Sequence, residues 1–124
     1  MADFKLAPVE AKFADIIWKN APIPSPELVK ICEKELNWKK STTYTELKKL
    51  CNRGLFKNEK ACVSALLTRD EFYAGHSRRY VAETFGGSLP KFLTAFIDGN
   101  TLTEKQAKEI ENIIYMHLVN SNRG

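Results

Sequence analysis

The sequence predicts a mainly α-helical protein with a small β-hairpin. Apolar residues recur at helical spacing through most of the 124 residues. Between residues 55 and 67 the spacing changes to the two-residue period of strands. Basic residues concentrate around the helical segment just before that change. We therefore predict two domains, 1–69 with the hairpin and the basic cluster, and 70–124, which is helical throughout.

Two helices are predicted before residue 37. The first carries an apolar stripe from Leu6 to Ile17, and Pro8 suits its first turn, where a missing N–H costs nothing. The second is expected to start with Ser25 as its N-cap and Pro26 at the first helical position. Both starts are local signals, so they predict where the helices begin without reference to the rest of the fold.

The third predicted helix runs from about Ser41 to Arg53 and ends at Gly54, which can adopt a left-handed conformation. At 100° per residue its inward face is Thr43, Leu47, Leu50 and Cys51. The opposite strip contains no carboxylate and consists of Ser41, Thr45, Lys48, Lys49 and Asn52, with Thr42 and Tyr44 on its flanks. This strip can donate and accept hydrogen bonds and carries positive charge.

The two strand-like segments, 55–59 and 62–67, form the predicted hairpin. Three further helices follow, at about 70–85, 88–97 and 103–118, with Ser88 as one cap and a Thr103–Gln106 capping box. The order helix, helix, helix, hairpin is that of a winged helix-turn-helix, whose last helix before the hairpin enters the DNA major groove.

Charge supports that reading of the N-terminal part. Residues 1–69 carry a net charge of +5, whereas residues 70–124 carry −1. Side chains that contact DNA should be basic or able to form hydrogen bonds, without carboxylates that repel phosphate. The predicted DNA-binding residues are Lys39, Lys40, Ser41, Thr42, Tyr44, Thr45, Lys48, Lys49, Lys57 and Lys60. The alternative is a protein-interaction module whose basic surface binds an acidic partner.

The C-terminal helices carry more apolar surface than three short helices can cover by themselves. A second copy of the chain would cover it and would present two DNA-binding surfaces to a pseudo-palindromic operator. The predicted dimerisation residues are Phe72, Tyr80, Phe92, Leu93, Phe96, Ile97, Ile110, Ile114 and Leu118.

Other functional classes find little support. No apolar run approaches the roughly 18 residues of a membrane span, and the opening residues lack a secretory signal, so we expect a cytoplasmic protein without membrane insertion. No nucleophile–base spacing surrounds His76 or His117, so no enzyme, catalytic residue or cofactor is expected. Three cysteines without a CxxC pair predict reduced thiols rather than a metal site, with Cys62 the one candidate for an exposed redox sensor.

Several segments resemble the penicillinase repressor family of bacteria over nearly the full chain. They are the Ile17-Trp18 pair, Trp38, the run from Thr42 to Leu50, Arg53-Gly54-Leu55, and Phe85-Gly86-Gly87-Ser88-Leu89-Pro90 followed by Ala95-Phe96-Ile97-Asp98-Gly99. The resemblance implies a homodimeric winged-helix repressor that blocks transcription by binding a double-stranded operator. It also implies a membrane sensor metalloprotease as a partner that triggers cleavage of the dimerisation part.

The chain departs from the family pattern at three places. The scissile bond of the family aligns with Ala95-Phe96, where well-known members have Asn in place of Ala95. The wing has Ala61-Cys62 where the family often has Gly-Arg, so different wing contacts are expected. The end of the chain lacks the cysteine-rich tail of the copper-responsive branch, so we do not expect copper sensing.

Overall fold

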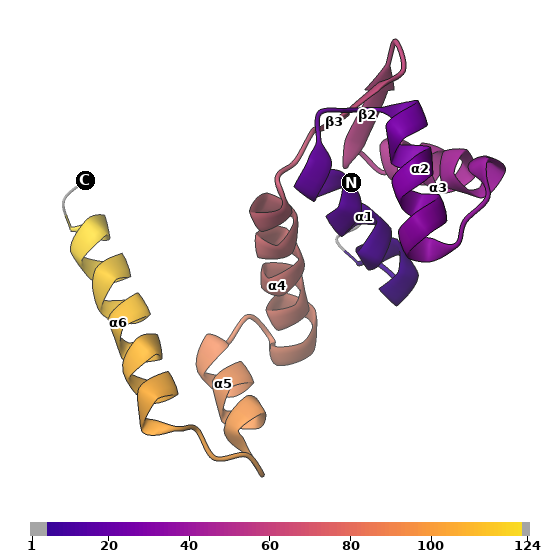
Figure 1. Ribbon diagram of the computed structural model, residues 1–124. Helices are drawn as coiled ribbons and strands as arrows, with labels where there is room; N and C mark the ends of the chain where they lie inside the picture. Colours follow the sequence, from indigo (N-terminus) through magenta and orange to yellow (C-terminus); the bar gives the residue numbers. More distant parts are fainter. Residues whose placement is uncertain (1–4, 123–124) are drawn as a thin grey trace. The chain divides into compact units, whose positions relative to one another are not determined.

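The computed structural model describes residues 5–122, so the four opening residues used to exclude a secretory signal lie outside it. This part of the chain contains six helices and a β-hairpin, which are labelled in Figure 1. The elements are α1 (Pro8–Asn20), β1 (Ile23–Pro24), α2 (Ser25–Leu36), α3 (Lys40–Asn52), β2 (Phe56–Glu59), β3 (Cys62–Ala65), α4 (Arg69–Phe85), α5 (Leu89–Ile97) and α6 (Glu104–Ser121). The predicted mainly helical fold with a winged helix-turn-helix is confirmed.

The chain forms two compact units, one ending at Tyr80 and the other beginning at Val81. We call described residues 5–80 the head and residues 81–122 the C-terminal unit. The predicted domain boundary, between residues 69 and 70, falls at the start of α4, whereas the compact units divide within that helix, so the first part of α4 belongs to the head. The roles assigned to the two domains stay predictions.

The core of the head lies among α1, α2, α3 and the sheet. Phe13, Ile17, Leu28 and Leu47 are completely or almost completely buried there. The spacing of these residues follows the predicted helical stripes, because one side of each helix must face its neighbours. Phe56 and Val63 close the core from the sheet, with exposures of 1% and 0%.

The sheet has three antiparallel strands in the order β1-β3-β2. Phe56 pairs with Ala65 and Glu59 with Cys62 in the hairpin, which we call the wing together with its turn. The strand β1 was not predicted: it has two residues, Ile23 opposite Val63 and Pro24 opposite Cys62. A strand this short, ending in proline, gives no alternating pattern to detect.

The helix ends in the structure can be compared with the capping residues predicted from the sequence. Pro8 occupies the first turn of α1, as predicted, and Gly54 after α3 has a φ of 85°, the left-handed conformation expected there. The prediction for Ser25 is wrong: α2 begins at Ser25, its N-cap is Pro24, and no side chain caps this end. The Ser25 side chain instead forms a tertiary hydrogen bond with Tyr44.

An aromatic cluster joins the start of α4 to the rest of the head. Trp18 lies with ring centroids 5.3 Å from Phe56 and 5.7 Å from Phe72. The Trp18 indole N–H also donates to the Leu67 carbonyl at 2.9 Å. We predicted Phe72 at the dimer surface, but it is 0% exposed in the core of the head, where no second chain can contact it.

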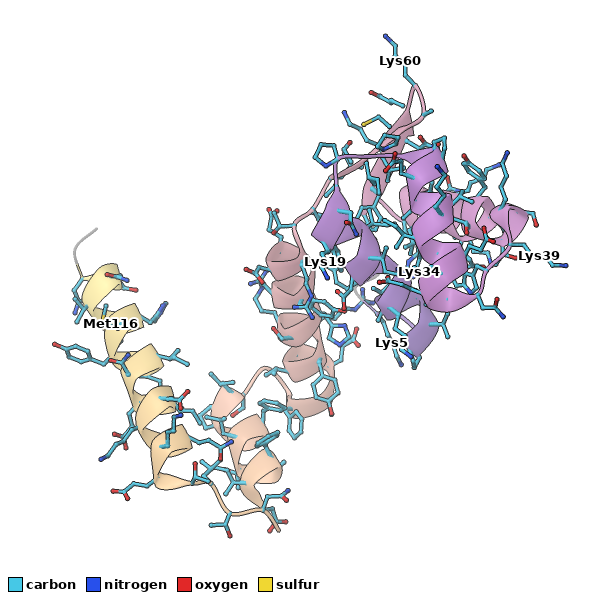
Figure 2. The ribbon with its side chains drawn as sticks, viewed as in Figure 1. Lys5, Lys19, Lys34, Lys39, Lys60 and Met116 are labelled. Carbon is cyan, nitrogen blue, oxygen red and sulfur yellow. The ribbon has the colours of Figure 1, made fainter. Side chains whose placement is uncertain are left out.

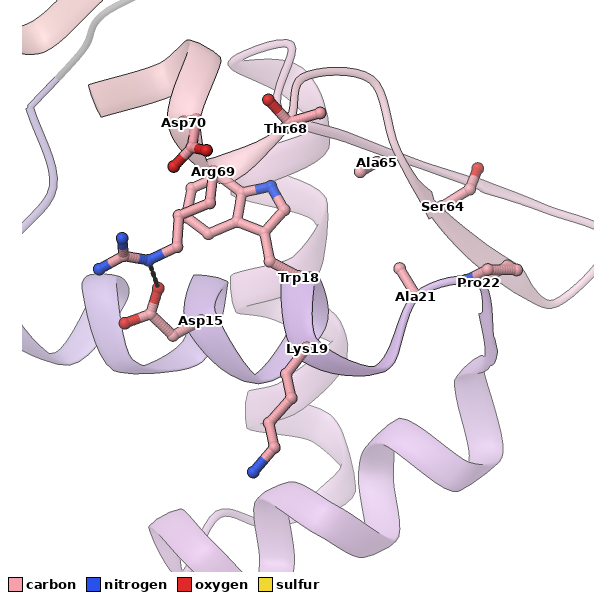
Figure 3. A pocket seen from close by; sticks show the side chains of 10 residues that line it. All are labelled: Asp15, Trp18, Lys19, Ala21, Pro22, Ser64, Ala65, Thr68, Arg69 and Asp70. Carbon is pink, nitrogen blue, oxygen red and sulfur yellow. Dashed lines mark hydrogen bonds and ion pairs between the residues drawn. The ribbon is translucent and has the colours of Figure 1, made fainter. Parts of the chain in front are cut away.

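A pocket of about 760 Å³ lies beside this joint, between the end of α1, β3 and the start of α4 (Figure 3). Its Asp15 carboxylate accepts a hydrogen bond from Arg69 Nε at 2.9 Å. The Arg69 guanidinium also lies 4.7 Å from the centre of the Tyr73 ring. Asp15 and Arg69 therefore link α1 to the start of α4. The hydrogen bond with Asp15 raises the pKa of Arg69.

The C-terminal unit consists of the end of α4 together with α5 and α6. Ser88 caps α5 by accepting from the Lys91 N–H at 3.2 Å, and Thr103 and Gln106 form the predicted capping box of α6. None of the described residues after Phe72 is buried. No helix in the described part of the chain is long and apolar enough to cross a membrane.

Candidate nucleic-acid interface

The helix α3 has one face in the core and one in solvent. Thr43, Leu47 and Leu50 are at most 1% exposed and fix the helix against the head. The opposite residues, which we call the outer face, are all exposed: Ser41, Thr42, Thr45, Lys48, Lys49 and Asn52. The helical period therefore predicted the outer face and three of the four inward residues, while the fourth, Cys51, is half-buried. The outer face carries hydroxyls, an amide and two lysines.

Two internal contacts shape the outer face. The Thr45 hydroxyl donates to the Ser41 carbonyl at 2.9 Å, so its oxygen remains available as an acceptor. Lys49 Nζ lies 3.1 Å from a Glu46 carboxylate oxygen, with 60% of the lysine side chain exposed. Exposed pairs of this kind contribute about 0–1 kcal/mol, so a phosphate can replace the carboxylate.

The start of α3 is a second source of positive potential. Its N-cap is Lys39, which makes no side-chain capping bond, and its first turn contains no acidic residue. The first N–H groups of a helix have no acceptor within it, and the helix dipole makes this end positive. Exposed Lys39 and Lys40 add two full charges, and Figure 2 shows the Lys39 side chain extending into solvent.

The wing extends the basic surface. Lys60 lies at the tip of the hairpin (Figure 2), and Lys57 in β2 is exposed with Nζ 3.6 Å from Glu59. The turn places Lys60 and Ala61 at φ values of 52° and 59°. Both values are uncommon for residues with a side chain, and a two-residue turn of this kind favours Asn-Gly. The hairpin is confirmed although that signal is absent.

Tyr44 differs from the other predicted DNA-binding residues because it is only partly exposed. Its ring packs against the core of the head. Its hydroxyl donates to Ser25 Oγ at 3.1 Å, and Ser25 is 3% exposed. Sequence reasoning missed Ser25 as a partner because a contact between positions 19 residues apart leaves no periodic signal.

The predicted dimerisation residues other than Phe72 have solvent access. Phe96, Ile114 and Leu118 are 61%, 50% and 55% exposed. Tyr80 and Ile97 are also exposed, and Phe92, Leu93 and Ile110 are half-buried. Further large apolar side chains are exposed that we had not predicted: Leu89, Ile113, Tyr115 and Met116. Ile113 belongs to the apolar stripe of the last helix, whereas Tyr115 and Met116 lie outside that stripe.

The cysteines are free thiols in three environments. Cys32 is buried, and its burial raises its pKa to about 11. Burial also raises the pKa of Cys51, which is half-buried, whereas Cys62 is exposed on the wing. No group of three or more His, Cys, Asp or Glu side chains within residues 5–122 is placed to hold a metal ion.

Three packed helices, a β-hairpin beside them and an exposed basic helix face define a winged helix-turn-helix protein, a class in which one helix is presented for reading DNA. The family model described as "Penicillinase repressor" matches residues 6–116. The chain therefore belongs to the penicillinase repressor family. It is 20% identical over 117 residues, 91% of each chain, to the penicillinase repressor of Bacillus licheniformis.

Membership of this family makes the protein a repressor-type regulator of transcription rather than a member of an enzyme class. The match agrees with the resemblance seen in the sequence, whose segments from Ile17 to Gly99 all lie within the matched residues.

Proposed function

We propose that the protein is a homodimeric transcriptional repressor that binds a pseudo-palindromic operator in double-stranded DNA and thereby blocks transcription. The observation that carries the proposal is the outer face of α3: exposed lysines and hydroxyls on a helix whose other face is locked in the core. A rigidly held helix of this composition matches the groove-reading helix of a helix-turn-helix.

The roles divide by chemistry. Lys39, Lys40, Lys48 and Lys49, with Lys57 and Lys60 on the wing, contact phosphates and set the register of the protein on the duplex. Thr42 and Thr45 reach base edges, and Ser41, near the start of α3, donates to a phosphate together with the free N–H groups there. Thr45 accepts a hydrogen bond from a base amino group or places its methyl group on that of thymine, because its own proton is committed to the Ser41 carbonyl.

The C-terminal unit supplies the dimer. None of its described residues is buried, and at least half of the surface of Phe96, Ile114 and Leu118 is exposed to solvent. A second copy of the chain covers this apolar surface, and two-fold symmetry then matches the symmetry of a pseudo-palindromic operator.

A membrane sensor metalloprotease is a further proposed partner, on the basis of the family resemblance. Ala95 and Phe96 are exposed, and both lie inside α5. A protease that cuts between them therefore has to unwind this nine-residue helix first. Loss of α5 would remove part of the proposed dimer surface and weaken operator binding.

Salt dependence of binding tests the proposal. A dimer that neutralises about eight phosphates should give a slope near −7 when log affinity is plotted against log salt concentration. We expect this slope between about 50 and 200 mM salt for a duplex from the region upstream of the protein's own gene, with weaker binding to random duplex. Affinity that does not change with salt would refute it, and equal affinity for both duplexes would favour the alternative of a basic surface for an acidic protein.

A further inference from the structure

Ser25 contacts both elements of the proposed DNA interface. Its side-chain oxygen accepts a hydrogen bond from the Tyr44 hydroxyl of α3 at 3.1 Å. Its backbone N–H donates to the Ala61 carbonyl in the wing turn at 2.8 Å. A single residue, 3% exposed, therefore connects α3 to the wing.

The backbone half of this connection follows from the position of Ser25 at the start of α2. The first N–H groups of a helix have no acceptor within the helix. Pro24, the last residue of β1, has no N–H to offer to β3. Ser25, the next residue, does have an N–H group, and it donates this group to the Ala61 carbonyl in the wing turn.

The side-chain half depends on the boundary position of Tyr44. This residue lies between buried Thr43 and exposed Thr45, so its ring packs on the core while its hydroxyl points toward the start of α2. Without the hydroxyl, the Ser25 oxygen would be buried without a donor, which is the costly way to lose a hydrogen bond. The tyrosine hydroxyl therefore restrains how α3 sits against α2.

The wing turn is the part that most needs such support. Lys60 and Ala61 both have positive φ values, which L-residues adopt only at an energetic cost. Strained turns persist when neighbouring structure holds them. The bond from Ser25 holds the carbonyl of Ala61, the residue directly after Lys60 at the tip.

We infer that Ser25 and Tyr44 are positioning residues that fix the wing relative to α3, so that Lys60 and the outer face of α3 reach one duplex together. The inference rests on the proposed function for its DNA consequence. Tyr44 acts here through Ser25 and the turn, and not through a contact with a base.

The first experiment needs no DNA. Amide hydrogen exchange, followed by NMR, reports whether the Ser25 N–H stays bonded to the wing turn. In a Tyr44→Phe variant we expect exchange at Ser25 to become about fivefold faster, because a lost hydrogen bond of ordinary strength loosens the start of α2. The matched control is Tyr73→Phe, which removes a hydroxyl from the same unit and should leave Ser25 exchange unchanged.

General destabilisation would give a different result. It would speed exchange at core amides such as that of Phe13 as well, whereas loss of the connection should be confined to Ser25, Lys60 and Ala61 and their neighbours. Ser25→Ala should reproduce the effect of Tyr44→Phe, and combining the two should add nothing further. Unchanged Ser25 exchange in Tyr44→Phe, or equal acceleration throughout the head, would overturn the inference.

The second experiment is a double-mutant cycle on the upstream duplex. If the connection positions the wing, the loss of affinity caused by Lys60→Ala should be at least about threefold smaller in the Tyr44→Phe background than in the wild type. In the control cycle, with Tyr73→Phe in place of Tyr44→Phe, the affinity losses of the two single variants should multiply in the double variant, as they do for independent mutations. If the losses also multiply in the Tyr44→Phe cycle, the inference is overturned. Absence of duplex binding by the wild-type protein would instead refute the proposed function, while amide exchange would still decide whether Tyr44 supports the wing turn.

Discussion

The head and the C-terminal unit use similar helices in opposite ways. In the head, thirteen hydrophobic residues are buried in one core. In the C-terminal unit none of the described residues is buried, although α5 and α6 are rich in isoleucine, leucine and phenylalanine. The head is therefore stabilised by contacts within its own chain, whereas the C-terminal unit leaves large apolar side chains exposed, and these form the surface that we propose a second copy covers.

The largest effect that tests this difference is expected in the head. Phe72→Ala should lower its free energy of unfolding by about 3–5 kcal/mol, because a fully buried ring leaves a cavity next to Trp18. Urea unfolding followed by circular dichroism measures the change. Phe96→Ala, at a ring that is 61% exposed, is the control and should leave the head transition in place. Similar losses in the two variants would contradict the comparison.

The next effect concerns the C-terminal unit. Ile114→Glu places a charge in the proposed dimer surface and should convert the dimer to a monomer, lowering duplex affinity on the order of 100-fold through lost avidity. Sedimentation measures the mass, and fluorescence anisotropy with labelled duplex measures the affinity. Asn112→Glu adds the same charge on the other side of α6 and should stay dimeric. A dimer that survives Ile114→Glu would remove this surface from the proposal.

A smaller effect separates the two units by charge. Lys48→Ala should make the salt slope less steep by about two, one phosphate contact per subunit, and weaken operator and random duplex alike. Lys105→Ala removes the same charge from α6 and should leave the slope as it is. If both variants shift the slope equally, overall charge rather than the outer face of α3 governs binding.

The smallest expected effect is a change in stability within the head, at the turn of the wing. Ala61→Gly should stabilise the protein by up to about 1 kcal/mol, because glycine adopts the positive φ of this turn without strain. Ala65→Gly, in β3, should destabilise it by about 0.5–1 kcal/mol, because glycine has more freedom to lose. Thermal unfolding measures both. Destabilisation by Ala61→Gly would show that the turn is not strained.

The features that the sequence predicted well are local ones. The two faces of α3 follow from a period of 3.6 residues, and the caps at Ser88 and Thr103 involve residues three positions apart. The family resemblance rests on the order of such segments, so it too could be seen before the structure.

The features that escaped prediction depend on contacts between distant segments. Phe72 continues the apolar pattern of α4, and nothing in that pattern tells whether its partner is Trp18 or a second chain. Ser25 has the residue type and setting of an N-cap, yet its oxygen is taken by Tyr44, 19 positions away. In both cases the residue type indicated burial or hydrogen bonding, and the tertiary fold selected the partner.

The position of Trp18 gives the protein a built-in optical reporter. Its indole lies against Phe72 and Tyr73 at the start of α4. The ring of the other tryptophan, Trp38, lies with its centroid 5.0 Å from that of Phe13. With Trp38 replaced by phenylalanine, the remaining emission would come from Trp18 alone. A shift of that emission to longer wavelength would then record water reaching the joint, so detachment of the start of α4 from the rest of the head can be followed in real time without an attached dye.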